Sequence, residues 1–208
     1  LIGLFFNILS TIMTLIYDPT LTSAPWWLPP LTGICMFTYQ TFDNMDGKQA
    51  RKIGASSPLG LLFDHGCDAI TAGLTVIPLA SVFGVGWSAT GMFTLWFSTF
   101  FTFFVQTWEE YYLHEMWLPI VNGASEGLVM ISSACIATGY VGTQWWQTPS
   151  INLHQSLVPM FPFQFLIFNV LCISGPAILT QIVKTLKYLY YTNEINNIQK
   201  KEIFLQTI

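Results

Sequence analysis

Long apolar stretches, separated by short polar breaks, dominate the pattern of hydrophobic and polar positions along this chain. They predict spans over residues 1–17, 31–52, 59–83, 87–107, 122–140 and 161–190, of which the second continues through two aspartates to a charged end. No charged residue occurs in residues 69–108 or 127–183, so each of these segments exceeds the ~20 residues that a helix needs to cross a bilayer. The pattern predicts an all-α, polytopic membrane bundle with about six transmembrane helices.

The polar breaks indicate where these helices begin and end. Trp26 and Trp27 precede a Pro-Pro pair and are typical of a membrane interface. Residues 53–58 are expected to form a turn, with Ser57-Pro58 opening the next helix. Residues 108–119 are expected at or outside the membrane surface, and residues 142–159 as a polar loop. We expect one domain over residues 1–191, cut short at its N-terminus, and a polar segment over 192–208 that leads to a missing C-terminal part.

The basic residues predict one orientation for these spans. If the turn after residue 47 is cytosolic, alternation puts residues 108–119 and the segment after residue 183 on the same side. All seven Lys and Arg residues then face the cytosol, and the three opposite loops contain none. This distribution satisfies the positive-inside rule.

Composition narrows the class of protein. The chain is 52% hydrophobic and 9% charged, with a mean hydropathy of +0.52, which excludes an ordinary soluble domain. Seven basic residues form no extended patch, so the sequence predicts no nucleic-acid partner. The four cysteines lack CxxC spacing and are interpreted as packing residues.

Most of the candidate chemistry lies in residues 42–68. One set of side chains recurs at i, i+3, i+4 and i+7 of a helix: Asp43, Asp46, Gly47 and Ala50. A second set follows the turn at i, i+4 and i+8: Gly60, Asp64 and Asp68. Two helices joined by this turn would direct four carboxylates toward one another at the membrane boundary, where an ionisable side chain is functional by default.

Four converging carboxylates need a compensating charge. At ~6 Å and an effective dielectric constant of ~20, each like-charge pair costs roughly 3 kcal/mol, and six pairs cost on the order of 15 kcal/mol. Oxygen ligands without a histidine partner favour Mg²⁺ or Mn²⁺ over zinc or iron. We expect two such ions ~4 Å apart on Asp43, Asp46, Asp64 and Asp68, an arrangement that binds a phosphate or pyrophosphate during displacement.

The spacing D-x2-D-G-x2-A-R-x8-G-x3-D-x3-D, which runs from Asp43 to Asp68, resembles the signature of the CDP-alcohol phosphotransferase family. The flanking Ser56-Ser57-Pro58-Leu59-Gly60 and Asp64-His65-Gly66-Cys67-Asp68 are similar to the eukaryotic choline and ethanolamine phosphotransferases. Leu61 departs from that branch, which has an acidic residue at this position. The position lies off the aspartate face and leaves the family resemblance intact.

The resemblance implies an activity and its setting. The protein would transfer phosphocholine or phosphoethanolamine from CDP-choline or CDP-ethanolamine to diacylglycerol, and would release CMP. It would be an integral membrane homodimer of the endoplasmic reticulum or Golgi, with its site facing the cytosol. The residues expected to bind substrate are Asn44, Gly47, Lys48, Ala50, Arg51 and Gly60; Arg51 and Lys48 would pair with phosphates.

His65 is the expected general base, because it lies beside Asp64 at the membrane boundary. On its helix it points about 100° away from the aspartate face. The resemblance implies a glutamate partner on a later helix, and Glu126 is the best match. Asp68 is the alternative base, as in many members of the family. Glu109, Glu110 and Glu115 are interpreted as surface charges.

Other functions stay open at this point. Another CDP-alcohol phosphotransferase could use a different acceptor, such as inositol or an alkyl-acylglycerol. A cation transporter could use the same carboxylates as an ion path, but the Ala50-Arg51 pair and the glycines would then have no role. A catalytically silent relative would also satisfy the pattern. Release of CMP from a CDP-alcohol separates these possibilities.

Overall fold

The described part of the chain is built from α-helices alone. The computed structural model describes residues 1–113, 126–147 and 175–206, and within these ranges it contains no strand. The helices are α1 (Ile2–Tyr17), α2 (Leu28–Lys52), α3 (Pro58–Val82), α4 (Ala89–Leu113), α5 (Glu126–Val141), α6 (Gln144–Gln147) and α8 (Gly175–Gln206). The prediction of an all-α fold is confirmed for these ranges.

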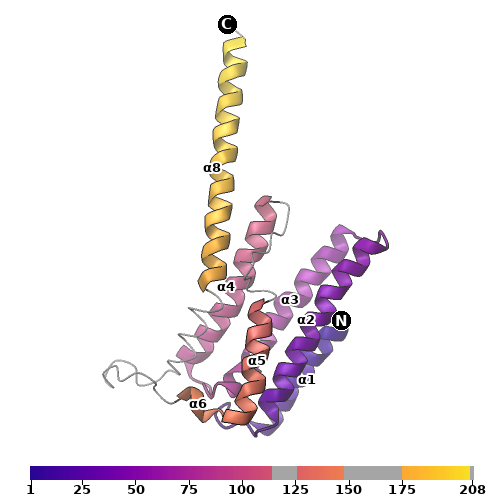
Figure 1. Ribbon diagram of the computed structural model, residues 1–208, viewed down its shortest axis with the longest axis vertical. Coiled ribbons are helices and arrows are strands. Elements are labelled where there is room, and N and C mark those ends of the chain that lie inside the picture. The colour runs from indigo at the N-terminus through magenta and orange to yellow at the C-terminus, as the bar shows by residue number, and fades with distance from the viewer. Residues whose placement is uncertain (114–125, 148–174, 207–208) are drawn as a thin grey trace, which may run out of the picture.

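Helix α2 is central to the packing. It contacts α1 on one side and α5 on another, while α3 contacts α1 and α4, and α8 packs on α4. Figure 1 shows the α2–α3 turn, the C-terminal end of α4 and the far end of α8 pointing toward one end of the molecule. The α1–α2 loop, the α3–α4 loop and α6 lie at the opposite end. This alternation is the one that the positive-inside argument requires.

Local chemistry defines the turn between α2 and α3. Gly54 has a φ of +67°, in the left-handed region that favours glycine. Its N–H donates to the Arg51 carbonyl, and the Ala55 N–H donates to the Ala50 carbonyl, a Schellman ending for α2. Helix α3 then begins with Pro58 in its first turn, and the Ser57 hydroxyl accepts a hydrogen bond from the Gly60 N–H at 3.1 Å.

Helix α1 buries its small and polar face and exposes its apolar face. Its buried residues are Gly3, Asn7, Ser10, Thr11 and Thr14. Ser10 donates to Thr32 of α2, and Thr11 to the Leu74 carbonyl of α3. Phe5 is 60% exposed and Ile16 is 63% exposed. Helices packed within lipid have this arrangement, in which small and hydrogen-bonding residues face other helices and large apolar residues face outward.

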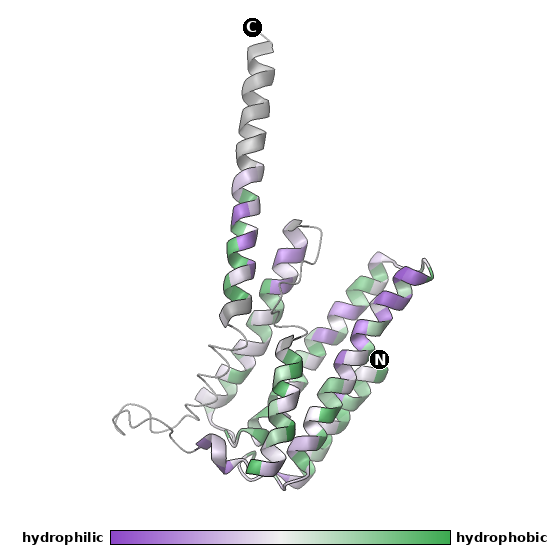
Figure 2. Cartoon of the chain, viewed as in Figure 1, coloured by the Kyte–Doolittle hydropathy of each residue, from purple (hydrophilic) through white to green (hydrophobic). Residues whose placement is uncertain are grey.

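The apolar core lies toward the end opposite the α2–α3 turn. It is formed by Leu21, Met36, Val76, Leu79, Ala80, Val82, Phe83, Leu95, Ile131, Cys135 and Trp146. Trp146 of α6 packs edge-on against Phe83 with ring centroids 4.8 Å apart, and its indole N–H donates to Thr138. In Figure 2, hydrophobic colouring predominates at this end, whereas hydrophilic colouring gathers near the α2–α3 turn.

Two expected boundaries were wrong. Helix α4 continues to Leu113 rather than ending at residue 107, because partners on α3 and α8 hold two of its glutamates. The expected loop over 142–159 contains the short helix α6. The polar segment expected after residue 191 is helical as far as Gln206 and continues α8.

By length and composition, one described helix, α3, is long and apolar enough to cross a membrane. Helix α1 and the Gly127–Val141 part of α5 are apolar but shorter. The expectation of about six spans therefore stays a prediction, and residues 148–174, where the sixth was expected to start, lie outside the described residues.

Candidate active site

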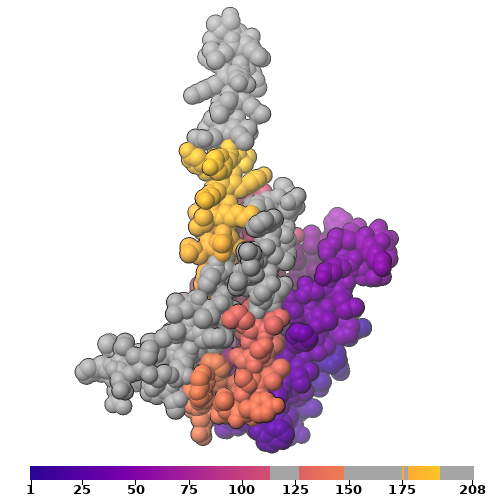
Figure 3. All heavy atoms as spheres, in the orientation of Figure 1, coloured from indigo at the N-terminus to yellow at the C-terminus, as the bar shows by residue number. Residues whose placement is uncertain are grey.

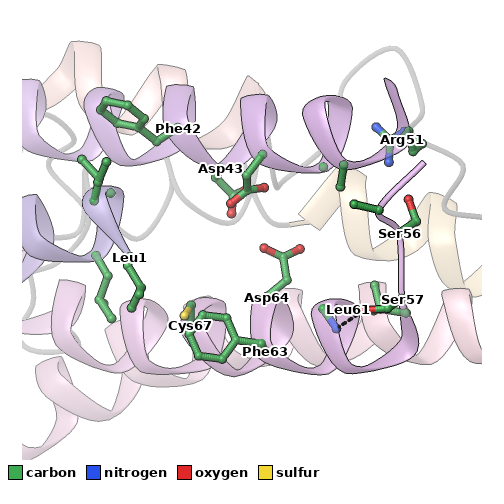
Figure 4. A pocket seen from close by; sticks show the side chains of 18 of the residues that line it. Leu1, Phe42, Asp43, Arg51, Ser56, Ser57, Leu61, Phe63, Asp64 and Cys67 are labelled. Carbon is green, nitrogen blue, oxygen red and sulfur yellow. Dashed lines mark hydrogen bonds between the residues drawn. The ribbon is translucent and has the colours of Figure 1, made fainter. Parts of the chain in front are cut away.

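A cavity of about 920 Å³ lies between α2, α3 and the start of α1. Its wall contains the full predicted face of α2, namely Asp43, Asp46, Gly47 and Ala50, together with Gly60 and Asp64 of α3. Figure 4 shows Asp43 and Asp64 pointing toward each other from the two helices. The turn supplies Ser56 and Ser57 at one end of this cavity, and the other end is apolar.

The cavity concentrates negative charge. The carboxylates of Asp46, Asp64 and Asp68 all act electrostatically on that of Asp43. Asp64 also experiences the charges of Asp46 and Asp68. At the ~6 Å scale of such a cluster, each like-charge pair costs roughly 3 kcal/mol. The site is therefore built to attract a cation or a positively charged group.

Asp68 is held differently from the other three aspartates. The Tyr39 hydroxyl of α2 donates a hydrogen bond to Asp68 Oδ1, so this carboxylate is tied across the α2–α3 interface. Tyr39 is one of the described residues that line the cavity, whereas Asp68 is not. Tyr39 in turn packs against α1, since a Cβ on Gly3 would lie 3.1 Å from its ring.

These donors fit the divalent cations expected from the sequence. Asp43, Asp46 and Asp64 offer carboxylate oxygens, which suit Mg²⁺ or Mn²⁺. Among the described residues, no group of three or more His, Cys, Asp or Glu side chains is already arranged to hold a metal ion. Metal binding at this site therefore stays a prediction that the donor chemistry supports.

The small residues of the face leave room beside the charges. A Cβ on Gly47 would lie 3.5 Å from Nη1 of Arg51, so the guanidinium lies alongside this glycine. Arg51 also lines the cavity, at the end formed by the turn. A planar guanidinium at that place can form bidentate contacts with a phosphate.

Two expected substrate-binding residues lie elsewhere. Asn44 is exposed, and its side-chain amide donates to the Gln40 carbonyl of its own helix at 2.9 Å. Lys48 is exposed as well. In the described part of the chain, neither belongs to the cavity wall. Their roles in binding stay predictions.

His65 faces away from the cavity, toward α4. Its Nε2 lies 3.3 Å from Oε2 of Glu110, and Phe103 packs edge-on against its ring with centroids 6.4 Å apart. Glu126 begins α5, but its side chain lies outside the described residues. The pairing of His65 with Glu126 therefore stays a prediction, as does the base role of either His65 or Asp68.

The interpretation of Glu109 as a surface charge was wrong. Its side chain is 3% exposed, and its Oε1 accepts a hydrogen bond from Nζ of Lys184 of α8 at 2.9 Å. Glu110 is partly buried and contacts His65. Helices α3 and α8 both pack against α4, and each supplies the partner of one of these adjacent glutamates. Glu115 lies outside the described residues.

Sequence reasoning missed Tyr39 and Glu110. Tyr39 could have been found, because it precedes Asp43 by four residues and so shares its helical face. Glu110 carries no such local signal, since its partner is on another helix and depends on how α3 packs against α4.

Figure 3 shows the α2–α3 hairpin standing clear of the rest of the described surface, so the charged end of the cavity lies near the outside of the molecule.

The amino-acid sequence is similar to those of a known protein family. A sequence model of the CDP-alcohol phosphatidyltransferase family matches residues 2–173 of the 208-residue chain.

Several curated proteins are similar in sequence. Choline/ethanolaminephosphotransferase 2 of Arabidopsis thaliana is 42% identical over 150 residues, covering 72% of this chain and 38% of that protein. Cholinephosphotransferase 1 of Saccharomyces cerevisiae is 37% identical over 172 residues, covering 82% of this chain and 42% of that protein. Cholinephosphotransferase 1 of Xenopus laevis is 32% identical, covering 77% of this chain and 40% of that protein.

The matched region amounts to about two fifths of the length of these curated relatives. The family model covers most of the chain, including all of α2 and α3 and therefore the whole aspartate motif. The resemblance inferred from that motif is confirmed: the chain belongs to the CDP-alcohol phosphatidyltransferase family.

Proposed function

We propose that the protein containing this chain transfers phosphocholine or phosphoethanolamine from a CDP-alcohol to diacylglycerol, with release of CMP. One observation carries the proposal: the family's motif residues lie on two helices that face each other across a single cavity. The names of the relatives point to the same two head groups.

The composition of the cavity suits these two substrates. Arg51 and the turn serines at one end offer contacts for the phosphates of a nucleotide ester. Leu1, Phe42 and Phe63 make the other end apolar, which suits the glycerol and acyl portion of a lipid acceptor (Figure 4). The carboxylates of Asp43 and Asp64 lie between these two ends (Figure 4).

The proposed reaction is a displacement at the β-phosphorus. The acceptor hydroxyl oxygen forms a bond to phosphorus, the bond to the CMP oxygen breaks, and the hydroxyl proton is taken up by His65. The His65 ring contacts α4, so it would have to turn toward the cavity to receive this proton. Divalent cations on Asp43, Asp46, Asp64 and Asp68 would neutralise the pyrophosphate and the departing CMP. Asp43 and Asp64, on separate helices, would hold those cations, which would position the donor phosphates relative to the acceptor.

We propose an integral membrane protein of the endoplasmic reticulum or Golgi with the cavity open to the cytosol. The placement of the α2–α3 turn, the end of α4 and the far half of α8 at one end supports this orientation (Figure 1). Lys48, Arg51 and Lys52 lie in the last two turns of α2 beside that turn, and the other four basic residues lie on α8. A homodimer is implied by the resemblance alone and stays a prediction.

The alternatives are less well supported. An inositol acceptor would not need the apolar end formed by Leu1, Phe42 and Phe63. An alkyl-acylglycerol would fit that end equally well. A cation transporter is disfavoured because the chain belongs to a transferase family.

The test is an assay of the full-length protein in membranes that lack endogenous activity. CDP-choline and CDP-ethanolamine would each be supplied with diacylglycerol, and CMP and the lipid product would be measured. Product formation with at least one donor is expected. Well-folded protein that releases no CMP from either donor, with diacylglycerol, alkyl-acylglycerol or inositol present, would contradict the proposal.

A further inference from the structure

Tyr39 connects the two motif helices at the inner part of the cavity. It lies on α2 one turn before Asp43, lines the cavity, and is 6% exposed. Its hydroxyl donates a hydrogen bond to Oδ1 of Asp68 on α3. Because donor and acceptor lie on the two helices that carry the aspartates, this bond fixes one carboxylate face relative to the other.

Asp68 belongs to the aspartate cluster although it is not on the described cavity wall. Of the three carboxylates that act electrostatically on Asp43, Asp68 acts most strongly, and the two side chains lie close enough to share a hydrogen bond. Since Tyr39 donates to Oδ1, Oδ2 is the oxygen that Asp68 can offer to a cation beside Asp43. The tyrosine therefore contacts the side of Asp68 that a shared cation would not use.

Helix α1 fixes the place of the Tyr39 ring. A Cβ on Gly3 would lie 3.1 Å from Cδ2 of the ring and 3.2 Å from the Tyr39 carbonyl oxygen, so the backbone of α1 lies directly against this residue. Packing this close restricts the rotamers that a ring can adopt. The hydroxyl is thus a donor at a fixed position, and it restrains the carboxylate that accepts from it.

We propose that Tyr39 is a positioning residue for Asp68, whose carboxylate it holds where Asp68 can share a divalent cation with Asp43. This inference rests on the cation binding in the proposed function. Carboxylates that bind metal ions are themselves held by hydrogen bonds, and loss of such a bond lowers metal affinity by about 10- to 100-fold. Without the hydroxyl, repulsion from Asp43 would turn Asp68 away.

The test is binding of Mn²⁺ to the full-length protein without substrate, followed by electron paramagnetic resonance. Tyr39→Phe keeps the ring and removes only the hydroxyl, and should weaken Mn²⁺ binding by about 10- to 100-fold. Unchanged or tighter binding would overturn the proposal, because the hydroxyl would then be neutral or would compete with the cation for Asp68.

Ser10→Ala is the matched control. It removes another buried hydroxyl between α1 and α2, which lies 3.1 Å from that of Thr32, and Ser10 is not one of the described residues that line the cavity. This substitution should lower the Tm and leave Mn²⁺ binding unchanged. Equal weakening of Mn²⁺ binding by Ser10→Ala and Tyr39→Phe would overturn the proposal, since any loosening of α1 on α2 would then have the same effect.

A double-variant cycle tests whether Tyr39 acts through Asp68. Asp68→Ala removes both the cation ligand and the acceptor of the hydrogen bond, and should weaken Mn²⁺ binding on its own. Tyr39→Phe should then add almost nothing to that loss. Fully additive losses, or normal Mn²⁺ binding by Asp68→Ala, would overturn the proposal.

The metal dependence of turnover separates positioning from a general structural effect. In Tyr39→Phe, the Mn²⁺ concentration for half-maximal CMP release should rise by about 10- to 100-fold, and saturating Mn²⁺ should restore most of the turnover. Turnover that stays low at every Mn²⁺ concentration would overturn the proposal. Weaker Mn²⁺ binding by Tyr39→Phe, in a protein whose wild type releases no CMP, would uphold the role of Tyr39 and reject the proposed reaction.

Discussion

At the scale of single residues, the aspartates of the cavity should matter for catalysis and not for folding. Asp43→Asn or Asp64→Asn should reduce turnover by at least 10²-fold, the usual effect of removing one electrostatic contact to a developing charge. Without metal, the Tm should stay equal or rise, because each change relieves repulsion within the cluster. CMP release and thermal unfolding in EDTA are the two measurements.

An aspartate outside the cavity provides the matched control. Asp18 is 2% exposed and accepts hydrogen bonds from the Ser81 and Thr20 hydroxyls at 2.6 and 2.9 Å. Asp18→Asn should therefore lower the Tm and leave turnover per folded molecule near that of the wild type. A lower Tm for Asp43→Asn, together with an unchanged Tm for Asp18→Asn, would contradict the roles given to these two aspartates.

Removal of divalent cations tests the same carboxylates without a mutation. EDTA should abolish turnover, and Mg²⁺ or Mn²⁺ should restore it, because the oxygen donors of Asp43, Asp46 and Asp64 suit these ions. Binding of Mn²⁺ followed by electron paramagnetic resonance should weaken in Asp64→Asn. Full activity in EDTA would exclude the two-metal proposal.

The role of His65 can also be tested by a single substitution. His65→Ala should lower turnover by about 10²–10⁴-fold, the usual contribution of a positioned general base. Donor and metal binding should be little changed, since His65 faces α4 and not the cavity. A wild-type rate for His65→Ala, together with an inactive Asp68→Asn that still binds Mn²⁺, would move the base to Asp68.

At the scale of helices, close approach between α2 and α5 holds the cavity helix in place. A Cβ on Gly33 would lie 2.5 Å from the Ser132 carbonyl oxygen, so α5 would have to move. Gly33→Ala should destabilise the protein by about 1–3 kcal/mol, as overpacked sites do, and the change should be visible as a lower Tm.

Gly66 supplies the control for this prediction. It also lies in a helix, but a Cβ there would meet no atom within 4 Å. Gly66→Ala should therefore leave the Tm unchanged or raise it, since alanine favours a helix by about 1 kcal/mol over glycine. Equal destabilisation by both substitutions would show that helix–helix contact at Gly33 is not the cause.

At the scale of the whole molecule, the two ends of the bundle should lie on opposite sides of a membrane. A cysteine at Ser56, in the α2–α3 turn, should react with an impermeant reagent from the cytosolic side. A cysteine at Ser23, in the α1–α2 loop, should be protected until the membrane is permeabilised, because that loop lies at the opposite end (Figure 1). The reverse labelling pattern would refute access of a CDP-alcohol from the cytosol.

Much of the fold was contained in local sequence patterns. The hydropathy pattern predicted helices that correspond to α1, α2, α3, α4 and α5, and the Ser57-Pro58 pair predicted the start of α3. Helix periodicity predicted that Asp43, Asp46, Gly47 and Ala50 share a face, and all four line the cavity. These features could be predicted because they depend on residues within two or three turns of each other.

The partners of individual side chains were decided only by the tertiary structure. Asp68 binds Tyr39, 29 residues earlier, and Glu109 binds Lys184, 75 residues later. His65 meets Glu110 because α3 packs against α4. A local pattern says which face of a helix a residue occupies, but it does not say which helix covers that face. The sequence by itself therefore determined the family and the carboxylate faces. Packing among α2, α3, α4 and α8 decided that one aspartate is tied to a tyrosine and that the histidine is held from α4.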